Sequence, residues 1–254
     1  MHPEQLLTCA LDIGEMMLIS GAEIGRVEHS IQLICGAYGC KRTDVFTITS
    51  SIVVSIEDAD RNFYTQTRRI TGTQTNLSRL DQLNTLSREI CQKKPSYSFI
   101  QAKLRIIREM RAYPLWLRSA SSALIAGAFT VFFGGGWADM LVSSVLGALL
   151  CLCTHGLQRA GMNQIFVNVV GSFLVSLAAI AVVGWHWGED ANKIIIGNIM
   201  LLIPGIALTN SLRDMISGDI MSGMLRFFDA ILVAAAIAAG YILAAQLMGG
   251  TLWI

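Results

Sequence analysis

Apolar side chains in the first part of the chain recur three and four residues apart, which is the spacing of amphipathic helices. This pattern predicts helices over residues 3–19, 22–38, 76–91 and from about 98 onward. The first of these has no basic stretch before it and carries Glu4 and Asp12, so we expect an amphipathic helix rather than a signal peptide. Ser98 followed by Gln101 predicts a capping box at the start of the last helix.

In one stretch between these helices the spacing of the apolar residues changes. Apolar and polar side chains alternate over residues 44–56, which predicts a half-buried strand. The polar residues 57–62 then predict a turn, and 63–70 is expected to form the second strand of a hairpin. The expected fold of residues 1–112 is therefore α+β, with helices on a small sheet.

The rest of the chain is dominated by hydrophobic runs that are long enough, or nearly so, to cross a bilayer. They lie at about 115–134, 138–155, 164–184, 193–210 and 225–247. We therefore expect an α-helical membrane domain of about five transmembrane helices at 113–254, preceded by a cytoplasmic α+β domain at 1–112. The lipid bilayer is thus the first expected partner.

Composition and charge support this division. The chain is 53% hydrophobic and 15% charged, with a mean hydropathy of +0.54, which is typical of a membrane protein. Residues 1–118 hold 15 of the 19 Lys and Arg. The basic run at 103–118 directly precedes a hydrophobic run, so we interpret it as a juxtamembrane flank and expect no nucleic-acid partner.

The cations between the hydrophobic runs indicate an orientation. Arg118, Arg159, Arg213 and Arg226 fall on one side of the predicted membrane, and the other connections hold only Lys193. The positive-inside rule then places the N-terminus in the cytoplasm and the C-terminus outside. The tryptophans lie near the predicted interfaces, as an aromatic belt requires: Trp116, Trp137, Trp185, Trp187 and Trp253.

Residue patterns of common enzyme sites are missing from the sequence. It has no phosphate-cradling glycine loop, no paired His ligands and no nucleophile elbow. The six cysteines lack the spacing of metal ligands and suit a reduced compartment. We therefore expect no catalytic residues, metal or cofactor.

The segment 201–229 combines a helix break with charged residues. Pro204 and Gly205 interrupt a hydrophobic run, and Asn210, Arg213, Asp214, Asp219 and Arg226 follow. It is either a kinked helix that ends in an ordinary ion-paired loop, or a substrate-handling gate. Arg226 and Asp229 are spaced for an i,i+3 pair. Asn168 and Asn198, nearest to mid-membrane, either hold helices together or line a pathway.

Two segments resemble the threonine/serine exporter family. The first is SGAEIGRVEHSI at 20–31, and the second is PGIALTNSLRDMISGDIMSGMLRFFDA at 204–230. Family members of full length are single chains of about ten spans, so this chain is similar to the larger subunit of the two-component version, a pair associated with succinate export. The resemblance implies a multi-pass protein of the bacterial inner membrane, with its C-terminus in the periplasm.

The resemblance also implies a function. It indicates proton-motive-force-driven export of a small carboxylate or amino acid, namely a succinate-type dicarboxylate or threonine/serine. A small membrane-protein subunit would supply about four further spans, and a homo-oligomer is also possible. The alternatives are a membrane-anchored sensor or regulatory protein, or a hydrolase that uses the N-terminal domain.

The residues that the resemblance singles out fall into two groups. The N-terminal group is Gly21, Glu23, Arg26 and Glu28. The substrate or gate group is Asn198, Pro204, Gly205, Asn210, Arg213, Asp214, Gly218, Asp219, Gly223 and Arg226. Asn198 and Arg213 are included because of their own position and charge, and not because of the resemblance. We expect Arg213 or Arg226 to meet a substrate carboxylate, and Asp214 or Asp219 to take up the coupling proton.

Overall fold

The computed structural model describes residues 1–110 and 113–248 and divides the chain into two compact units. The described part of the first unit is 1–110 together with 206–228, and that of the second is 113–205 together with 229–248. The domain boundary expected from the sequence, at residue 112, left the segment 206–228 out of the first unit. This addition determines the candidate site.

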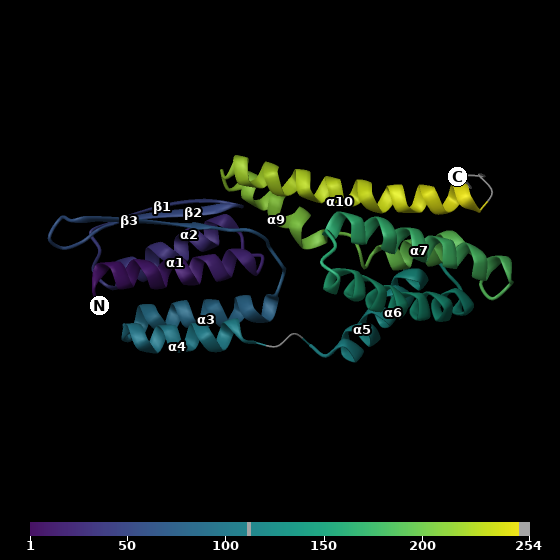
Figure 1. Ribbon diagram of the computed structural model, residues 1–254, viewed down its shortest axis with the longest axis horizontal. Coiled ribbons are helices and arrows are strands. Elements are labelled where there is room, and N and C mark those ends of the chain that lie inside the picture. The colour runs from purple at the N-terminus through teal and green to yellow at the C-terminus, as the bar shows by residue number, and fades with distance from the viewer. Residues whose placement is uncertain (111–112, 249–254) are drawn as a thin grey trace. The chain divides into compact units, whose positions relative to one another are not determined.

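The first unit is built in layers around helix α1. Figure 1 shows a sheet of β1 (Arg42–Ile48), β2 (Ser51–Glu57) and β3 (Phe63–Arg69), covered on one face by α1 (Pro3–Ile19) and α2 (Ile24–Ala37). The helices α3 (Leu77–Lys93) and α4 (Tyr97–Arg108) pack against that pair. Because α1 has neighbours on both sides, its apolar residues from Leu6 to Leu18 form the centre of the core.

The stretch 44–56, expected as one strand, is two strands. The antiparallel order is β1-β2-β3, and β1 pairs with β2 so that Phe46 lies opposite Val53. The tight turn at Thr49–Ser50 reverses the chain between them. This reversal places Phe46 on the outer face, 61% exposed, while Thr47 is buried. Simple alternation cannot show such a reversal, because both strands keep the same period of two.

The expected capping box on α4 is wrong. Ser96 is the N-cap residue and makes no side-chain cap bond. Gln101 donates instead to Asp12 on α1, with 3.0 Å between Nε2 and Oδ2. Arg68 on β3 donates to the other oxygen of Asp12 at 3.1 Å. A long-range polar contact thus replaces the local one and ties three elements together.

In the second unit, the helices are α5 (Leu115–Phe132), α6 (Trp137–Arg159), α7 (Gln164–Gly184), α8 (Ala191–Ile199) and the larger part of α10 (Ile220–Leu247). Among the described residues, four helices are long and apolar enough to cross a membrane, and these are α5, α6, α7 and α10. Trp116, Trp137, Trp185 and Trp187 are exposed beside the ends of these helices. Trp253 lies outside the described residues.

The run at 193–210, expected as a further span, is not one helix. Helix α8 ends at Ile199, turns follow, and α9 (Gly205–Ile216) begins after Pro204. Proline has no N–H for the next helical bond and restricts the residue before it to extended conformations. The N–H groups of Leu201 and Leu202 donate to the carbonyls of Asn198 and Ile199. Part of the backbone at the break therefore finds its hydrogen-bond partners in the preceding residues of the same segment.

Candidate functional site

The candidate site joins two segments of the first unit that are far apart in the sequence. We call residues 20–28 the α1–α2 corner and residues 206–228 the α9–α10 hairpin. Together they contain most of the residues singled out from the sequence. Four groups of contacts hold them together.

The first contact is a helix cap supplied from a distance. Glu23 stands at the N-cap of α2 but makes no side-chain cap bond. The N–H of Ile24 donates instead to Oδ1 of Asp214, at 3.2 Å and across 190 positions of the chain. A carboxylate suits this place because the first N–H groups of a helix lack partners and the helix dipole favours an anion. Asp214 is 2% exposed, so water does not compete with this bond.

The second group of contacts satisfies the backbone of the corner. Nδ2 of Asn210 donates to the carbonyl of Gly21 at 3.0 Å. Nη2 of Arg226 donates to the carbonyl of Ala22 at 2.9 Å. Gly21 has φ +92°, a conformation that favours glycine. The hairpin therefore binds two neighbouring backbone carbonyls of the corner.

The charged side chains form one buried ion pair and two pairs in which exposed arginines share Glu23. Nη1 of Arg226 lies 3.3 Å from Oδ2 of Asp214, and both side chains are largely buried. Nη1 of Arg213 lies 2.6 Å from Oε1 of Glu23, and the Arg213 side chain is 60% exposed. The same Glu23 oxygen also accepts from Arg26 at 3.2 Å. The expected pair between Arg226 and Asp229 is replaced by the contact with Asp214.

A fourth connection lies at the edge of the sheet. Oε1 of Glu28 accepts from the N–H of Thr47 at 2.8 Å, and the Ser222 hydroxyl donates to the Thr47 carbonyl at 3.4 Å. Both backbone groups of this edge residue are thus occupied by side chains. The sequence alone gave no signal for Thr47, because nothing local distinguishes it from the other polar residues of the strand.

Two glycines allow the hairpin to close. Gly218 has φ +101° in the turn between α9 and α10. A Cβ at Gly223 would approach the side chain of Met215 and lie 2.7 Å from the Ser211 carbonyl. Asp219, next to this turn, donates its N–H to the Asp214 carbonyl at 2.9 Å. Gly218 and Gly223 therefore serve the close approach of two helices.

Burial affects the carboxylates of the site. It raises the pKa of Asp214 above its ordinary value, against the opposing effects of Arg226 and the Ile24 N–H. Burial also raises the pKa of Glu28, opposed by the bond from Thr47 and increased by nearby Asp219. Within the described residues, Oδ2 of Asp214 makes no hydrogen bond, and its contact with Arg226 is an ion pair only. This oxygen is therefore the place in the site best suited to accept a proton.

The remaining candidates lie in the second unit. Asn198 is buried, and its Nδ2 donates to Ser143 Oγ and to the Ile194 carbonyl, both at 2.9 Å. Asn168 is also buried and accepts from Gln164 at 3.0 Å. Pro204 lies at the break before α9, and Gly205 is the first residue of that helix. Among the described residues, no cluster of His, Cys, Asp and Glu is arranged to hold a metal ion.

Comparison with known proteins gives several relatives. The chain is 25% identical over 245 residues to a probable threonine/serine exporter of Mycobacterium tuberculosis, covering 96% of this chain and 46% of that protein. It is 27% identical to a threonine/serine exporter of Corynebacterium glutamicum, with coverage of 95% and 51%. The chain thus spans about half the length of these two relatives. No solved structure matches it.

A third relative is matched over nearly the whole length of both chains. The chain is 22% identical to the probable succinate transporter subunit YjjP of Escherichia coli, covering 96% of this chain and 95% of that protein. The model of the family described as "Putative threonine/serine exporter" matches residues 8–248. Because this match includes both units and all the candidate residues, the protein belongs to that threonine/serine exporter family.

Proposed function

We propose that this protein is a subunit of an exporter in the bacterial inner membrane, which moves a small polar metabolite outward using the proton-motive force. The observation that carries the proposal is the attachment of the α9–α10 hairpin to the α1–α2 corner through Asp214. The hairpin follows the helix break at Pro204 and continues into the membrane-spanning part of α10. A segment between two membrane crossings is thus held by the N-terminal domain.

This attachment can act as a gate. Asp214 caps α2 and pairs with Arg226, so one buried side chain links the corner to both helices of the hairpin. A proton on Oδ2 of Asp214 would remove its negative charge, and with it the attraction to Arg226, while Oδ1 can still accept from the Ile24 N–H. Because burial of the charge outweighs that attraction and raises the pKa of Asp214 in the attached hairpin, loss of the proton is expected to loosen the hairpin, which couples a proton to movement of the segment between the crossings.

Arg213 is the better candidate for a substrate carboxylate. Arg226 is largely buried and is occupied by Asp214 and the Ala22 carbonyl. The Arg213 side chain is 60% exposed and pairs only with Glu23 in the described structure. Its guanidinium can leave an exposed pair at small cost and bind a carboxylate with two hydrogen bonds. Amino acids and dicarboxylates both carry this group.

The fourth crossing would be made by α8 and the irregular residues 200–204. Nine helical residues rise about 13.5 Å, roughly half of the hydrocarbon core. Broken helices of this kind occur in secondary transporters, where the irregular backbone faces protein or a cavity. With this crossing, the positive-inside orientation keeps the N-terminal domain in the cytoplasm and the C-terminus in the periplasm.

A partner chain completes the proposal. The chain spans about half of two exporters that it matches, and the relative of equal length is named as a subunit. We therefore assign to the partner about four further spans, on a small membrane protein. Association of this chain with a second copy is the other possible arrangement.

The test is an efflux measurement in loaded cells. The gene is deleted alone and together with any adjacent gene for a small membrane protein, and the retention of threonine, serine and succinate is followed over time. We expect slower loss of at least one of them, restored by returning the gene. Unchanged efflux of all three would overturn the exporter proposal.

A further inference from the structure

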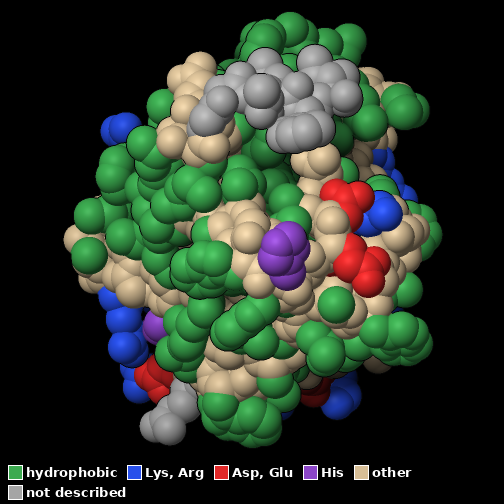
Figure 2. All heavy atoms as spheres, turned by 90° about the vertical axis from the view of Figure 1, so that its right-hand side faces the viewer, with side chains coloured by type: hydrophobic (Ala, Val, Ile, Leu, Met, Phe, Trp, Pro, Cys, Tyr) green, Lys and Arg blue, Asp and Glu red, His purple; other side chains and the backbone are tan. Residues whose placement is uncertain are grey.

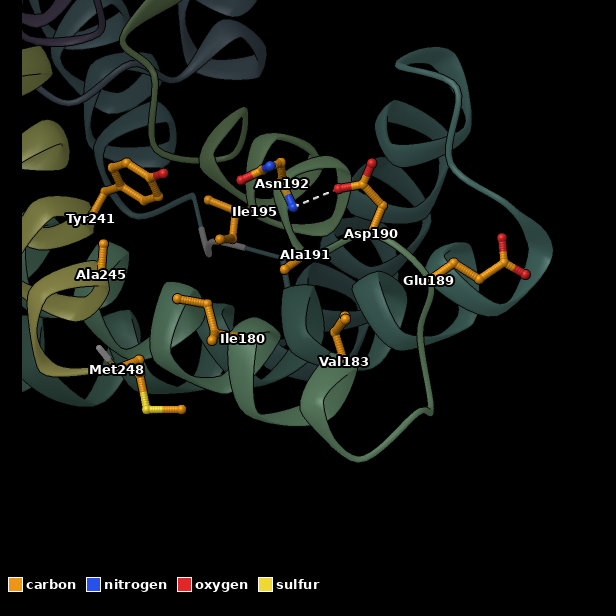
Figure 3. A pocket seen from close by; sticks show the side chains of 10 residues that line it. All are labelled: Ile180, Val183, Glu189, Asp190, Ala191, Asn192, Ile195, Tyr241, Ala245 and Met248. Atoms are coloured by element: carbon orange, nitrogen blue, oxygen red, sulfur yellow. Dashed lines mark hydrogen bonds between the residues drawn. The ribbon is translucent and has the colours of Figure 1, made fainter. Parts of the chain in front are cut away.

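The charged groups around the largest pocket shown are already occupied. Figure 2 shows a largely apolar face of the molecule, with a few acidic and basic side chains close together. Figure 3 shows a pocket of about 440 Å³ beside α7, α8 and α10, where Asp190 accepts from the backbone N–H of Asn192 at 2.9 Å. Asp190 also pairs with Lys193, and the Glu189 side chain points away from the pocket. A group of side chains with chemistry of its own lies in the first unit instead.

Two cysteines stand at the two ends of the turn that closes helix α2. The N–H of Cys40 donates to the carbonyl of Cys35 at 3.2 Å, and the N–H of Gly39 donates to the carbonyl of Gly36 at 3.0 Å. Gly39 has φ +91°. These two bonds and the left-handed glycine form a Schellman motif, in which the side chains of the first and last residues come into contact. The turn therefore brings the two thiols together.

The geometry of this turn suits a disulfide. The thiols of Cys35 and Cys40 interact directly as hydrogen-bond donor and acceptor. An amide nitrogen and a carbonyl oxygen lie about 1.5 and 2.4 Å from their own Cα atoms, so the 3.2 Å backbone bond limits the Cα separation to about 7 Å. Disulfides join cysteines whose Cα atoms are about 4.4–6.8 Å apart. A bond between the two sulfurs therefore requires little movement of the backbone.

The two thiols differ in exposure and in acidity. Cys35 is fully buried, whereas Cys40 is partly exposed. The hydrogen bond from Cys35 lowers the pKa of the Cys40 thiol below its ordinary value, against the opposing effects of burial and of Asp58. The same hydrogen bond, together with burial, raises the pKa of Cys35. Because the thiolate is the reactive form, Cys40 is the thiol that attacks and Cys35 is the one that follows.

We propose that Cys35 and Cys40 form a redox-active dithiol, which a low-molecular-weight disulfide of the glutathione type converts to an intramolecular disulfide. The Cys40 thiolate attacks one sulfur of the small disulfide, whose S–S bond breaks and whose first half leaves as a thiolate. The Cys35 thiol gives its proton to that thiolate and attacks Sγ of Cys40. The second half leaves as a thiolate and takes the proton that Cys40 had given to water. Two electrons thus pass from the protein thiols to the small disulfide, which becomes two thiols.

The resting state of this pair is the dithiol. The six cysteines are free thiols in the structure, as expected in a reducing compartment. An excess of the small disulfide shifts the pair to its oxidised form. The cross-link joins the last turn of α2 to the residues that lead into β1, at the opposite end of α2 from the cap supplied by Asp214. The inference therefore does not rest on the proposed export function.

The test follows the thiols of the full chain, purified in lipid nanodiscs. The protein is equilibrated with mixtures of reduced and oxidised glutathione, quenched with acid and alkylated in denaturant, and its peptides are identified by mass spectrometry. We expect Cys35 and Cys40 to lose their reactivity together, in a peptide that is lighter by two hydrogens and carries no glutathione. The proposal is overturned if both residues remain alkylatable at every glutathione ratio, or if Cys35 is joined to another cysteine.

Single variants separate the roles of the two thiols. In Cys35→Ser, we expect the exchange to stop with one glutathione on Cys40, and in Cys40→Ser we expect no glutathione on the buried Cys35. Cys91→Ser is the matched control, because Cys91 lies close enough to raise the pKa of Cys35 and is thus the alternative partner. Loss of the disulfide in Cys91→Ser, or no adduct in Cys35→Ser, would contradict the proposal. The wild-type measurement needs no variant, so a variant that fails to fold leaves it decisive.

Discussion

Asp214 and Arg226 lie on the two helices of one hairpin, and their side chains meet with Oδ2 and Nη1 3.3 Å apart. The other oxygen of Asp214 caps α2 through the Ile24 N–H, and the other terminal nitrogen of Arg226 holds the Ala22 carbonyl. Each side chain thus bonds both its partner and the α1–α2 corner. Loss of either side chain is therefore expected to affect the hairpin and the corner together.

Asp214→Asn is expected to abolish efflux while the protein still inserts into the membrane. The amide retains an acceptor for the Ile24 N–H but leaves the buried Arg226 without a counter-charge, at a cost of about 3 kcal/mol. Efflux from loaded cells and limited proteolysis of the hairpin measure the two effects. Asp229→Asn, an exposed change on α10, is the control and is expected to behave as wild type. Wild-type efflux in Asp214→Asn would remove this residue from the mechanism.

The raised pKa of Asp214 predicts how stability changes with pH. A carboxyl whose pKa is raised in the folded state contributes a stabilisation that is complete below its ordinary value of 3.8. That contribution is lost as pH rises through the raised, folded-state pKa. The melting temperature of wild type relative to Asp214→Asn should therefore fall as pH increases above about 4. The pKa of Glu28 is also raised, but Glu28 is present in both proteins, so its effect on the difference in melting temperature cancels. A relative melting temperature that rises with pH would contradict a raised pKa for Asp214.

Gly223→Ala is expected to force α9 and α10 apart. The added Cβ would lie 2.7 Å from the Ser211 carbonyl and 2.8 Å from the Met215 backbone nitrogen, and backbone atoms cannot move aside cheaply. We expect a destabilisation of about 1–3 kcal/mol and reduced efflux. Gly36→Ala in α2 is the matched control, because nothing lies within 4 Å of its Cβ position. There the better helix propensity of alanine predicts a gain of up to about 1 kcal/mol. Equal melting temperatures for the two variants would show that the close approach is unimportant.

Arg213→Gln and Glu23→Gln remove the same exposed ion pair from opposite sides. Because the Arg213 side chain is 60% exposed, each change is expected to cost less than about 1 kcal/mol of stability. If Arg213 also meets the substrate carboxylate, Arg213→Gln should raise the half-saturating concentration for efflux several-fold more than Glu23→Gln. The comparison requires inside-out vesicles and a range of substrate concentrations. Identical kinetics in the two variants would leave Arg213 as an ion-pair partner only.

Parts of the structure were predictable because their cause is local. The helical period of apolar residues correctly predicted α1, α2 and α3, and the hydrophobic runs correctly predicted α5, α6, α7 and α10. Pro204 and Gly205 marked a break, and the chain does break there. The errors arose where a local pattern fits two structures. The alternation at 44–56 is the same for one strand as for two, and Gln101 bonds a distant carboxylate instead of its own helix end.

The sequence by itself determined which segments are helical, which are apolar enough for a membrane, and that two charged motifs exist at 20–31 and 204–230. Only the tertiary structure decided that these motifs meet. Asp214 caps a helix that begins 190 residues earlier, and Arg226 pairs with Asp214 instead of Asp229. The physical reason is that a buried charge must find its partners within the fold, and packing rather than sequence spacing decides which ones lie within reach.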